Sequence, residues 1–143
     1  MTVAQVLRQK GSRVHTVGAE ESVQAAVERL SRERIGALVV MSGADRVAGI
    51  ISERDLVQAL ARDGAAAMQA KVADLMTRDI VFTSPEETIE HVMGMMTRHR
   101  VRHLPVQKND RLVGLVSIGD VVKWRIAQTE MEAAELRRYI AGG

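Results

Sequence analysis

The chain contains two copies of one roughly 60-residue unit, and this repeat limits the possible folds more than any other feature. When the chain is aligned with itself, residues 20–23 (EESV) match residues 86–89 (EETI). Further along, residues 49–55 (GIISERD) match residues 114–120 (GLVSIGD). Agreement in order, spacing and residue type predicts that both halves adopt the same fold.

Each copy contains one stretch with the periodicity of a half-buried helix. Its apolar residues recur at spacings of i, i+3, i+4 and i+7, which place them on one helix face. The two sets are Val23, Ala26, Val27 and Leu30 in the first copy, and Ile89, Val92, Met93 and Met96 in the second. In the second copy we expect Ser84 as the N-cap, Pro85 as the first helical residue and Glu87 as its capping partner.

Two short strands and a closing helix follow the amphipathic helix in each copy. Turn-forming Gly, Asn and Asp residues separate the strands. The predicted strand pairs cover residues 38–41 with 47–51, and 104–106 with 112–116, while the closing helices cover residues 53–62 and continue from residue 118 onward. Each unit therefore has the order strand, helix, strand, strand, helix.

The predicted organisation has four segments. They are a first repeat with a lead-in helix (residues 1–62), a linker (63–71), a second repeat (72–125) and a helical tail (126–143). Thr2 and Gln5 have the spacing of a capping box at the start of the lead-in helix. One such unit buries too little surface to be stable alone, so we expect two to pack sheet to sheet. The fold class is α+β, with two tandem β-α-β-β-α repeats related by pseudo-two-fold symmetry.

The composition argues against several classes of protein. Aromatic residues make up only 2% of the chain, so rings on which single-stranded nucleic acid could stack are scarce. The net charge of +2 is too small to indicate a nucleic-acid or membrane surface. Without cysteine there is no disulfide and no thiolate nucleophile. No apolar stretch approaches the about 20 residues of a membrane span, and we identify no signal peptide, so we expect a cytoplasmic protein.

The order of elements, together with a closing run of the form Gly-φ-φ-Ser-x-x-Asp, in which φ is an apolar residue and x any residue, resembles the CBS domain. A tandem pair of such domains is called a Bateman module. The resemblance covers about residues 3–125 and includes residues 72–77 (VADLMT) and 102–106 (RHLPV). The chain is similar to CBS-domain proteins of the stand-alone bacterial type. This resemblance implies AMP, ATP or NAD bound in clefts between the repeats, a homodimer, and a regulated partner protein.

The pairs Ser52 with Asp55, and Ser117 with Asp120, allow two interpretations. In the first they are capping boxes that only stabilise the helix starts. In the second the free amides and partial positive charge of each helix start hold a phosphate. The CBS resemblance implies that each Asp also binds the ribose hydroxyls and that each Ser reaches a phosphate.

The resemblance implies further contacts with an adenosine ligand. Thr16 and Thr83, near the ends of the first strands, would lie beside the ribose and phosphate; ordinary strand threonines are the alternative. Strand backbone and apolar groups would hold the base at Ile35, Gly36, Ala37, Val101, Arg102, His103, Leu104 and Pro105, and Gly119 belongs to the second helix start. For Ile35 and Val101 a plain core role is equally open.

A basic run is the main difference between the copies. Residues 98–103 (RHRVRH) match the nearly neutral residues 32–37 (RERIGA). The run is either a solvated surface or a phosphate-binding surface. The second is possible because one Arg side chain can donate two parallel hydrogen bonds to the oxygens of a phosphate. We predict unequal clefts, with charge from Arg102 and His103 in one and from Arg54 in the other.

No pattern indicates catalysis or a metal site. The four histidines (His15, His91, His99 and His103) lack metal-ligand spacing, and there is no Ser-His-Asp set or Walker lysine. The sequence therefore predicts a non-enzymatic adenine-nucleotide sensor that signals to its partner by a change of conformation. The alternatives are a structural, dimerising interaction module with degenerate clefts, and a module for S-adenosyl compounds or nucleic acid.

Overall fold

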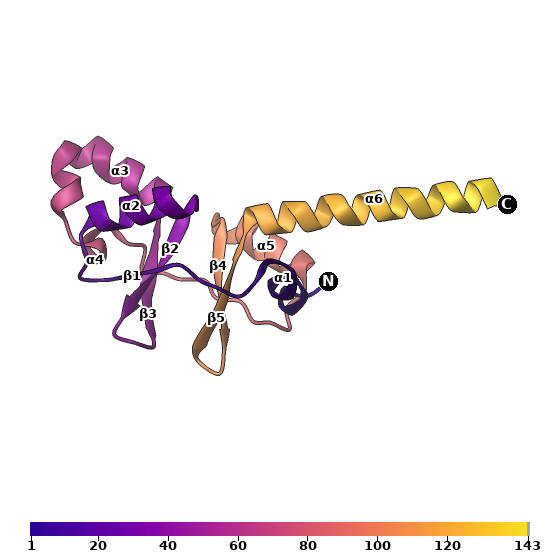
Figure 1. The fold of residues 1–143 in the computed structure, drawn as a ribbon, viewed down its shortest axis with the longest axis horizontal. Helices are drawn as coiled ribbons and strands as arrows, with labels where there is room; N and C mark the ends of the chain where they lie inside the picture. The colour runs from indigo at the N-terminus through magenta and orange to yellow at the C-terminus, as the bar shows by residue number, and fades with distance from the viewer. Residues whose placement is uncertain (143) are drawn as a thin grey trace.

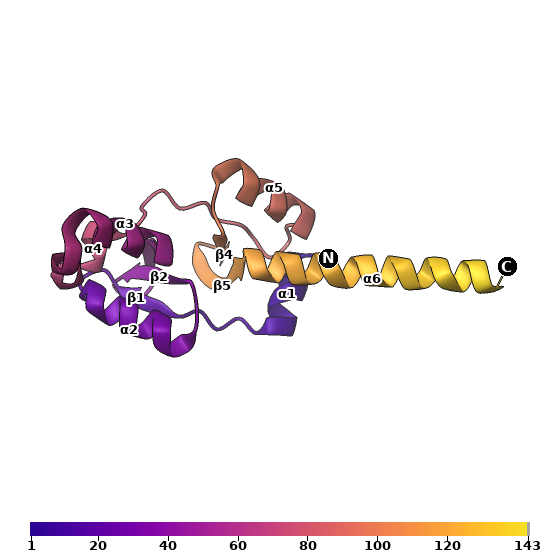
Figure 2. The same cartoon turned by 90° about the horizontal axis from the view of Figure 1, so that it is seen from above.

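Two similar halves lie side by side in the computed structural model, which describes residues 1–142, and one long helix projects from the second half (Figures 1 and 2). The first half holds β1 (Thr16–Gly18), α2 (Val23–Glu33), β2 (Ala37–Ser42), β3 (Arg46–Ser52), α3 (Glu53–Asp63) and α4 (Val72–Leu75). The second holds α1 (Val3–Lys10), α5 (Ile89–His99), β4 (His103–Lys108), β5 (Arg111–Ser117) and α6 (Ile118–Gly142).

Each half contains a small sheet. In the first, β2 pairs in parallel with β1 and antiparallel with β3. In the second, β4 and β5 form an antiparallel pair, and the expected first strand is reduced to one parallel bridge between Thr83 and Val106. The α+β fold with two tandem repeats is confirmed, but the prediction of a full first strand in the second repeat was wrong. Within that segment only Thr83 pairs with β4, and its N–H donates to the carbonyl of Pro105 at 3.0 Å.

The predicted helix faces are buried. Val23, Ala26 and Leu30 of α2, and their counterparts in α5, are at most 6% exposed. These counterparts are Ile89, Val92 and Met96. Each face joins a separate aliphatic core, so the periodicity predicted correctly which residues hold each helix to its sheet.

The two lead-in segments are exchanged between the halves. Val3 and Leu7 of α1 lie in the core of the second repeat, whereas Val72 and Met76, in and after α4, lie in the core of the first. Equivalent backbone bonds hold both segments. The N–H of Val3 donates to the carbonyl of Glu87 and the N–H of Val72 to the carbonyl of Glu21, each at 2.9 Å. Each core is therefore completed by a segment that precedes the other repeat in sequence.

This exchange moves the start of α5. The helix begins at Ile89 with Thr88 as its N-cap, and not at Pro85, so the predicted Ser84 cap was wrong. The carbonyls of Pro85 and Glu87 accept bonds from the N–H groups of Ala4 and Val3. Since these carbonyls are already paired with the lead-in segment, this stretch stays outside the helix.

The other boundaries also take their final form from packing. Within the predicted linker, residues Gly64–Gln69 form a 3-10 helix in which Ala67 is buried. α6 continues without a break from Ile118 to Gly142, so the predicted tail is an extension of the closing helix. Among the described residues, no helix is long and apolar enough to cross a membrane.

Two glycines allow the exchanged segments to cross the sheets. A Cβ atom on Gly49 would lie 2.7 Å from the carbonyl oxygen of Thr77 and 2.8 Å from the sulfur of Met76. On the equivalent Gly114 it would lie 2.7 Å from two methyl carbons of Leu7. The glycine that opens each Gly-φ-φ-Ser-x-x-Asp run is thus required by close packing.

We predict that Gly49→Ala destabilises the protein more than Gly114→Ala does. At Gly49 the new methyl group meets backbone, which cannot move independently, whereas at Gly114 it meets the end of a leucine side chain. Overpacking at Gly49 should cost roughly 1–3 kcal/mol in the free energy of unfolding, measured by urea denaturation. Gly94→Ala, in an open position on α5, is the control and should be neutral or stabilising. An equal or larger loss at Gly114 would contradict this account.

Candidate functional site

Both closing helices begin with the same hydrogen-bonded cap. At α3 the N–H of Ser52 donates to Oδ2 of Asp55 at 2.9 Å, and the N–H of Asp55 donates to Oγ of Ser52 at 3.4 Å. At α6, Ser117 and Asp120 make the equivalent bonds at 2.9 and 3.3 Å. Both pairs therefore have the geometry of a capping box, which either of the two interpretations requires. The four side chains are half-buried, so the caps remain partly open to solvent.

The exchanged segments add a different group to each cap. Thr77, which follows α4, donates its hydroxyl to Oδ1 of Asp55 at 3.1 Å. Lys10, the last residue of α1, donates its Nζ to Oδ2 of Asp120 at 2.7 Å and to the carbonyl of Leu115 at 2.8 Å. The two otherwise matched carboxylates therefore face a neutral hydroxyl in one repeat and a cation in the other.

Sequence reasoning identified neither Thr77 nor Lys10. A lysine in the last turn of a helix is ordinary, because it complements the helix dipole. Only the exchange of lead-in segments brings Lys10 to the second repeat, over a hundred residues away in sequence. No local pattern could have indicated this contact.

Several predicted residues come together where the repeats meet. Ala37 pairs with Ser52 across β2 and β3, and His103 pairs with Ser117 across β4 and β5. The imidazole of His103 fills the space beside Gly36, since a Cβ atom there would lie 3.6 Å from its Nε2. His103 thus reaches across from the second repeat to the backbone of the first.

The two predicted threonines do not occupy equivalent positions. Thr16 pairs with Val39 and so faces away from the core, which holds the neighbouring Val40. Thr83 pairs with Val106, a core residue, and is itself only 6% exposed. Its hydroxyl makes no hydrogen bond within residues 1–142. Of the two, Thr16 is on the face of its sheet opposite the core.

The predicted base-binding residues are largely engaged by the protein. Ile35 packs against the first core and Val101 against the second, as their plain core interpretation expected. Ala37 and Leu104 are 2% and 0% exposed, and Pro105 is also buried. These three residues therefore present almost no accessible surface in this structure.

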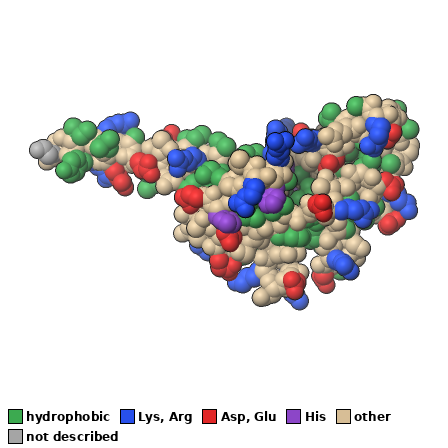
Figure 3. All heavy atoms as spheres, turned by 180° about the vertical axis from the view of Figure 1, so that it is seen from behind, with side chains coloured by type: hydrophobic (Ala, Val, Ile, Leu, Met, Phe, Trp, Pro, Cys, Tyr) green, Lys and Arg blue, Asp and Glu red, His purple; other side chains and the backbone are tan. Residues whose placement is uncertain are grey.

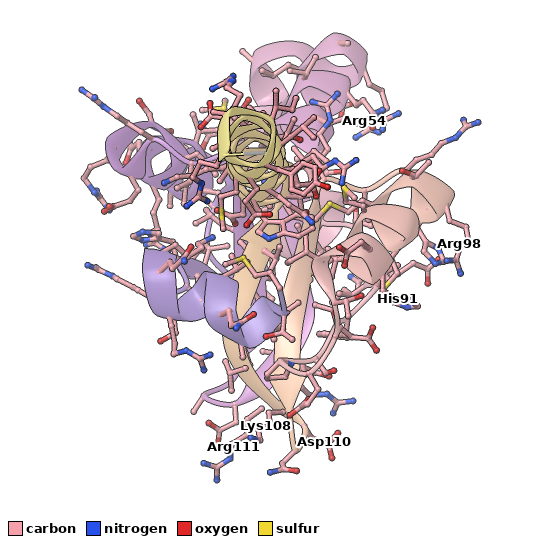
Figure 4. All side chains as sticks on the ribbon, turned by 90° about the vertical axis from the view of Figure 1, so that its right-hand side faces the viewer. Arg54, His91, Arg98, Lys108, Asp110 and Arg111 are labelled. Carbon is pink, nitrogen blue, oxygen red and sulfur yellow. The ribbon has the colours of Figure 1, made fainter. Side chains whose placement is uncertain are left out.

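Most of the basic run belongs to a helix end. Arg98 and His99 occupy the last turn of α5, where positive charge complements the helix dipole. Arg100 ends the helix with a φ of 55°, as Arg34 does for α2. In Figure 4, Arg98 extends outward from α5, well away from Arg54 on α3. Exposed Arg102, directly before β4, lies close to the cap of α6 together with His103, because its carbonyl accepts the N–H of Ile118 at 2.8 Å.

Two hollows lie toward the hairpin ends of the sheets. One of about 360 Å³ is lined by Thr83 and His91 among others, and one of about 500 Å³ by Thr16 and Arg29 among others. Neither is lined by the capping Ser and Asp residues. Figure 4 shows Lys108, Asp110 and Arg111 at the tip of the second hairpin, away from Arg54 at the start of α3.

His103 should make stability depend on pH. Burial lowers its pKa below the usual 6.5, nearby Lys10 and Arg102 lower it further, and Asp120 and Glu53 oppose them. The unfolded chain therefore binds more protons than the folded one just below pH 6.5, so stability falls as the pH is lowered through this range. Urea denaturation between about pH 7.5 and pH 5 should show a steeper loss for the wild type than for His103→Gln.

The matched control for this experiment is His99→Gln, since His99 is exposed at the end of α5. It should retain the wild-type dependence on pH. If His103→Gln and the wild type lost stability in parallel, the burial of a neutral His103 between the repeats would be refuted.

Comparisons with known proteins agree with this architecture. The family model described as CBS domain matches residues 3–62 and 72–127. A mitochondrial CBS domain-containing protein of Arabidopsis thaliana is 33% identical over 150 residues, covering 99% of this chain and 73% of that protein. The crystal structure of a CBS-domain-containing protein from Agrobacterium tumefaciens is 44% identical, with a TM-score of 0.85, covering 87% of this chain and 92% of that one.

A more distant structure carries ligands. It is the CBS domain pair of protein MJ0100 in complex with 5′-methylthioadenosine and S-adenosyl-L-methionine. It superposes with a TM-score of 0.80 at 22% identity, covering 90% of this chain and 98% of that one. At this identity the likeness concerns the fold.

Proposed function

The chain belongs to the CBS-domain family, and we propose that it is a regulatory module that binds an adenosine-containing ligand between its two repeats. The observation that carries the proposal is the matched pair of caps at α3 and α6. Each places a half-buried carboxylate and the positive end of a helix dipole at the end of a sheet, next to the other repeat. A carboxylate can accept both ribose hydroxyls, and the partial positive charge of a helix start suits an anion.

An adenosine compound is the proposed ligand class because a structural relative binds such compounds. The ligands of the MJ0100 domain pair both contain adenosine. In this chain Lys10, Arg54 and Arg102 add positive charge close to the caps. These groups favour a ligand with phosphate over one with a positively charged sulfonium. AMP, ATP and NAD are therefore the proposed ligands, ahead of S-adenosyl compounds.

The two sites should differ in strength. A ribose hydroxyl at Asp55 replaces only the hydroxyl of Thr77, whereas a ligand at Asp120 meets an ion pair with Lys10. A ligand phosphate gives Lys10 a new anionic partner, but adenosine alone does not. The site at Asp120 should accordingly be the more selective for phosphate.

Thermal unfolding with AMP, ATP, NAD and S-adenosylmethionine tests the proposal. A ligand at 100 times its dissociation constant adds about 2.7 kcal/mol to the stability of the folded state, which raises the midpoint by roughly 5 °C or more. We expect such a shift for the wild type and a smaller one for Asp55→Asn or Asp120→Asn, each compared with its own ligand-free midpoint. Asp63→Asn, at the exposed end of α3, should retain the full response. No shift with any of these ligands would refute the proposal.

Lys10→Gln separates phosphate recognition from adenosine recognition. We expect binding of AMP or ATP to weaken roughly fivefold or more in isothermal titration, because one charge-assisted contact is lost. Adenosine binding should change little. The control Arg8→Gln alters an exposed cation on the same helix and should have no effect. An equal loss for adenosine and AMP would show that Lys10 acts through the fold alone.

A structural interaction module is the second candidate function. It is favoured by the completeness of both capping boxes, which need no ligand to explain them. In either case we propose that the module acts without catalysis, as a homodimer, on a separate regulated protein. In the sensor, ligand binding between the repeats shifts their relative arrangement, and the partner binds one arrangement better.

A further inference from the structure

The projecting part of α6 carries an unpartnered apolar stripe. It leaves the second half of the molecule and extends beyond every other element (Figures 1 and 2). Val122, Ile126, Leu136 and Ile140 on this helix are between 48% and 70% exposed. Figure 3 shows hydrophobic side chains along the projection, with acidic and basic side chains among them. Apolar surface exposed on this scale indicates contact with another molecule.

The stripe has the spacing of a coiled-coil seam. It runs through Val122, Ile126, Thr129, Ala133, Leu136 and Ile140, with alternating steps of four and three residues. In heptad notation Ile126, Ala133 and Ile140 are the a positions, and Val122, Thr129 and Leu136 are the d positions. Branched Ile at a with Leu at d favours two strands over three or four. These positions therefore fit one further helix with the same pattern.

Charges beside the stripe identify the partner and its direction. The flanking e positions are Lys123, Glu130 and Arg137, and the flanking g positions are Arg125, Glu132 and Tyr139. In a parallel, in-register pair each g residue lies beside the e residue five positions later in the other helix. Arg125 then meets Glu130 of the second copy, and Glu132 meets Arg137 of the second copy. By symmetry every such pair is formed twice, and all are of opposite charge.

In an antiparallel pair with full overlap, the facing flanking residues do not have opposite charges. There e positions face e positions and g positions face g positions, with the helices crossing near Glu130 and Glu132. Lys123 meets Arg137 of the second copy, and Glu130 and Glu132 each meet their own counterpart. All of these pairs have like charge and oppose association. The charge pattern therefore selects one orientation.

From this complementarity we infer that residues 122–140 of α6 form a parallel two-stranded coiled coil with α6 of a second copy of the chain. The inference does not depend on ligand binding. It adds to the proposed homodimer the surface that joins the copies and their relative direction. Exposed Val57 and Leu60 on α3, the element equivalent to the start of α6, lie outside this seam and are not needed for it.

Complementary charge reversals test the contact in the full-length chain. One variant carries Glu130→Arg and Glu132→Arg, and the other carries Arg125→Glu and Arg137→Glu. For each variant alone, the dimer dissociation constant measured by sedimentation equilibrium should be at least about tenfold higher than that of the wild type. The reason is that attractive pairs become repulsive. An equimolar mixture of the two should restore the dimer, since every pair is then opposite again. A monomeric wild type, or unchanged dimers in both variants, would overturn the inference.

A single cysteine tests the direction of the helices, because the native chain has none. With Leu136→Cys, a parallel in-register pair places the two thiols face to face, with Cα atoms less than about 7 Å apart, so oxidation should give a covalent dimer. Met131→Cys is the control, since Met131 is 64% exposed but lies outside the seam. It should cross-link much more slowly. Equal rates for the two variants would exclude the parallel pairing.

Discussion

The exchange of the two lead-in segments is the constraint on which the rest of this structure depends. Val3 and Leu7 complete the core of the second repeat, while Val72 and Met76 complete the core of the first. A unit of about 60 residues is marginal alone because it buries too small a share of its surface. Each core includes a lead-in segment that precedes the other repeat in sequence, so neither core is complete without the whole chain. The two crossing segments hold the halves in one arrangement.

That arrangement also determines the candidate site. The caps of α3 and α6 are local features, built from residues three positions apart, and nearly identical in geometry. What differs is the group delivered by the exchanged segment, a hydroxyl in one repeat and the ammonium group of Lys10 in the other. A symmetric motif thereby becomes an asymmetric pair of sites. The glycine that begins each motif run serves this geometry too, because the exchanged segment crosses directly over it.

Much of the fold was predictable from short-range patterns. The apolar spacing in α2 and α5 identified their buried faces, and Ser-x-x-Asp identified the starts of α3 and α6. Predictions failed where a distant segment competes for backbone groups. Pro85 has the local signature of a helix start, but its carbonyl is bonded to the N–H of Ala4. Thr83 and Thr16 look alike in sequence, yet strand register places them on opposite faces of their sheets.

By itself the sequence determined the repeat, the buried faces of α2 and α5, the caps of α3 and α6, and the heptad pattern with its flanking charges. These depend on periodicity and on residues a few positions apart, which the chain carries in its order. Only the tertiary structure decided that Lys10 meets Asp120, that His103 lies against Gly36, and that the stripe on α6 remains exposed. Such contacts join residues far apart in the chain. They depend on how two completed cores are placed beside each other, and no local pattern encodes that placement.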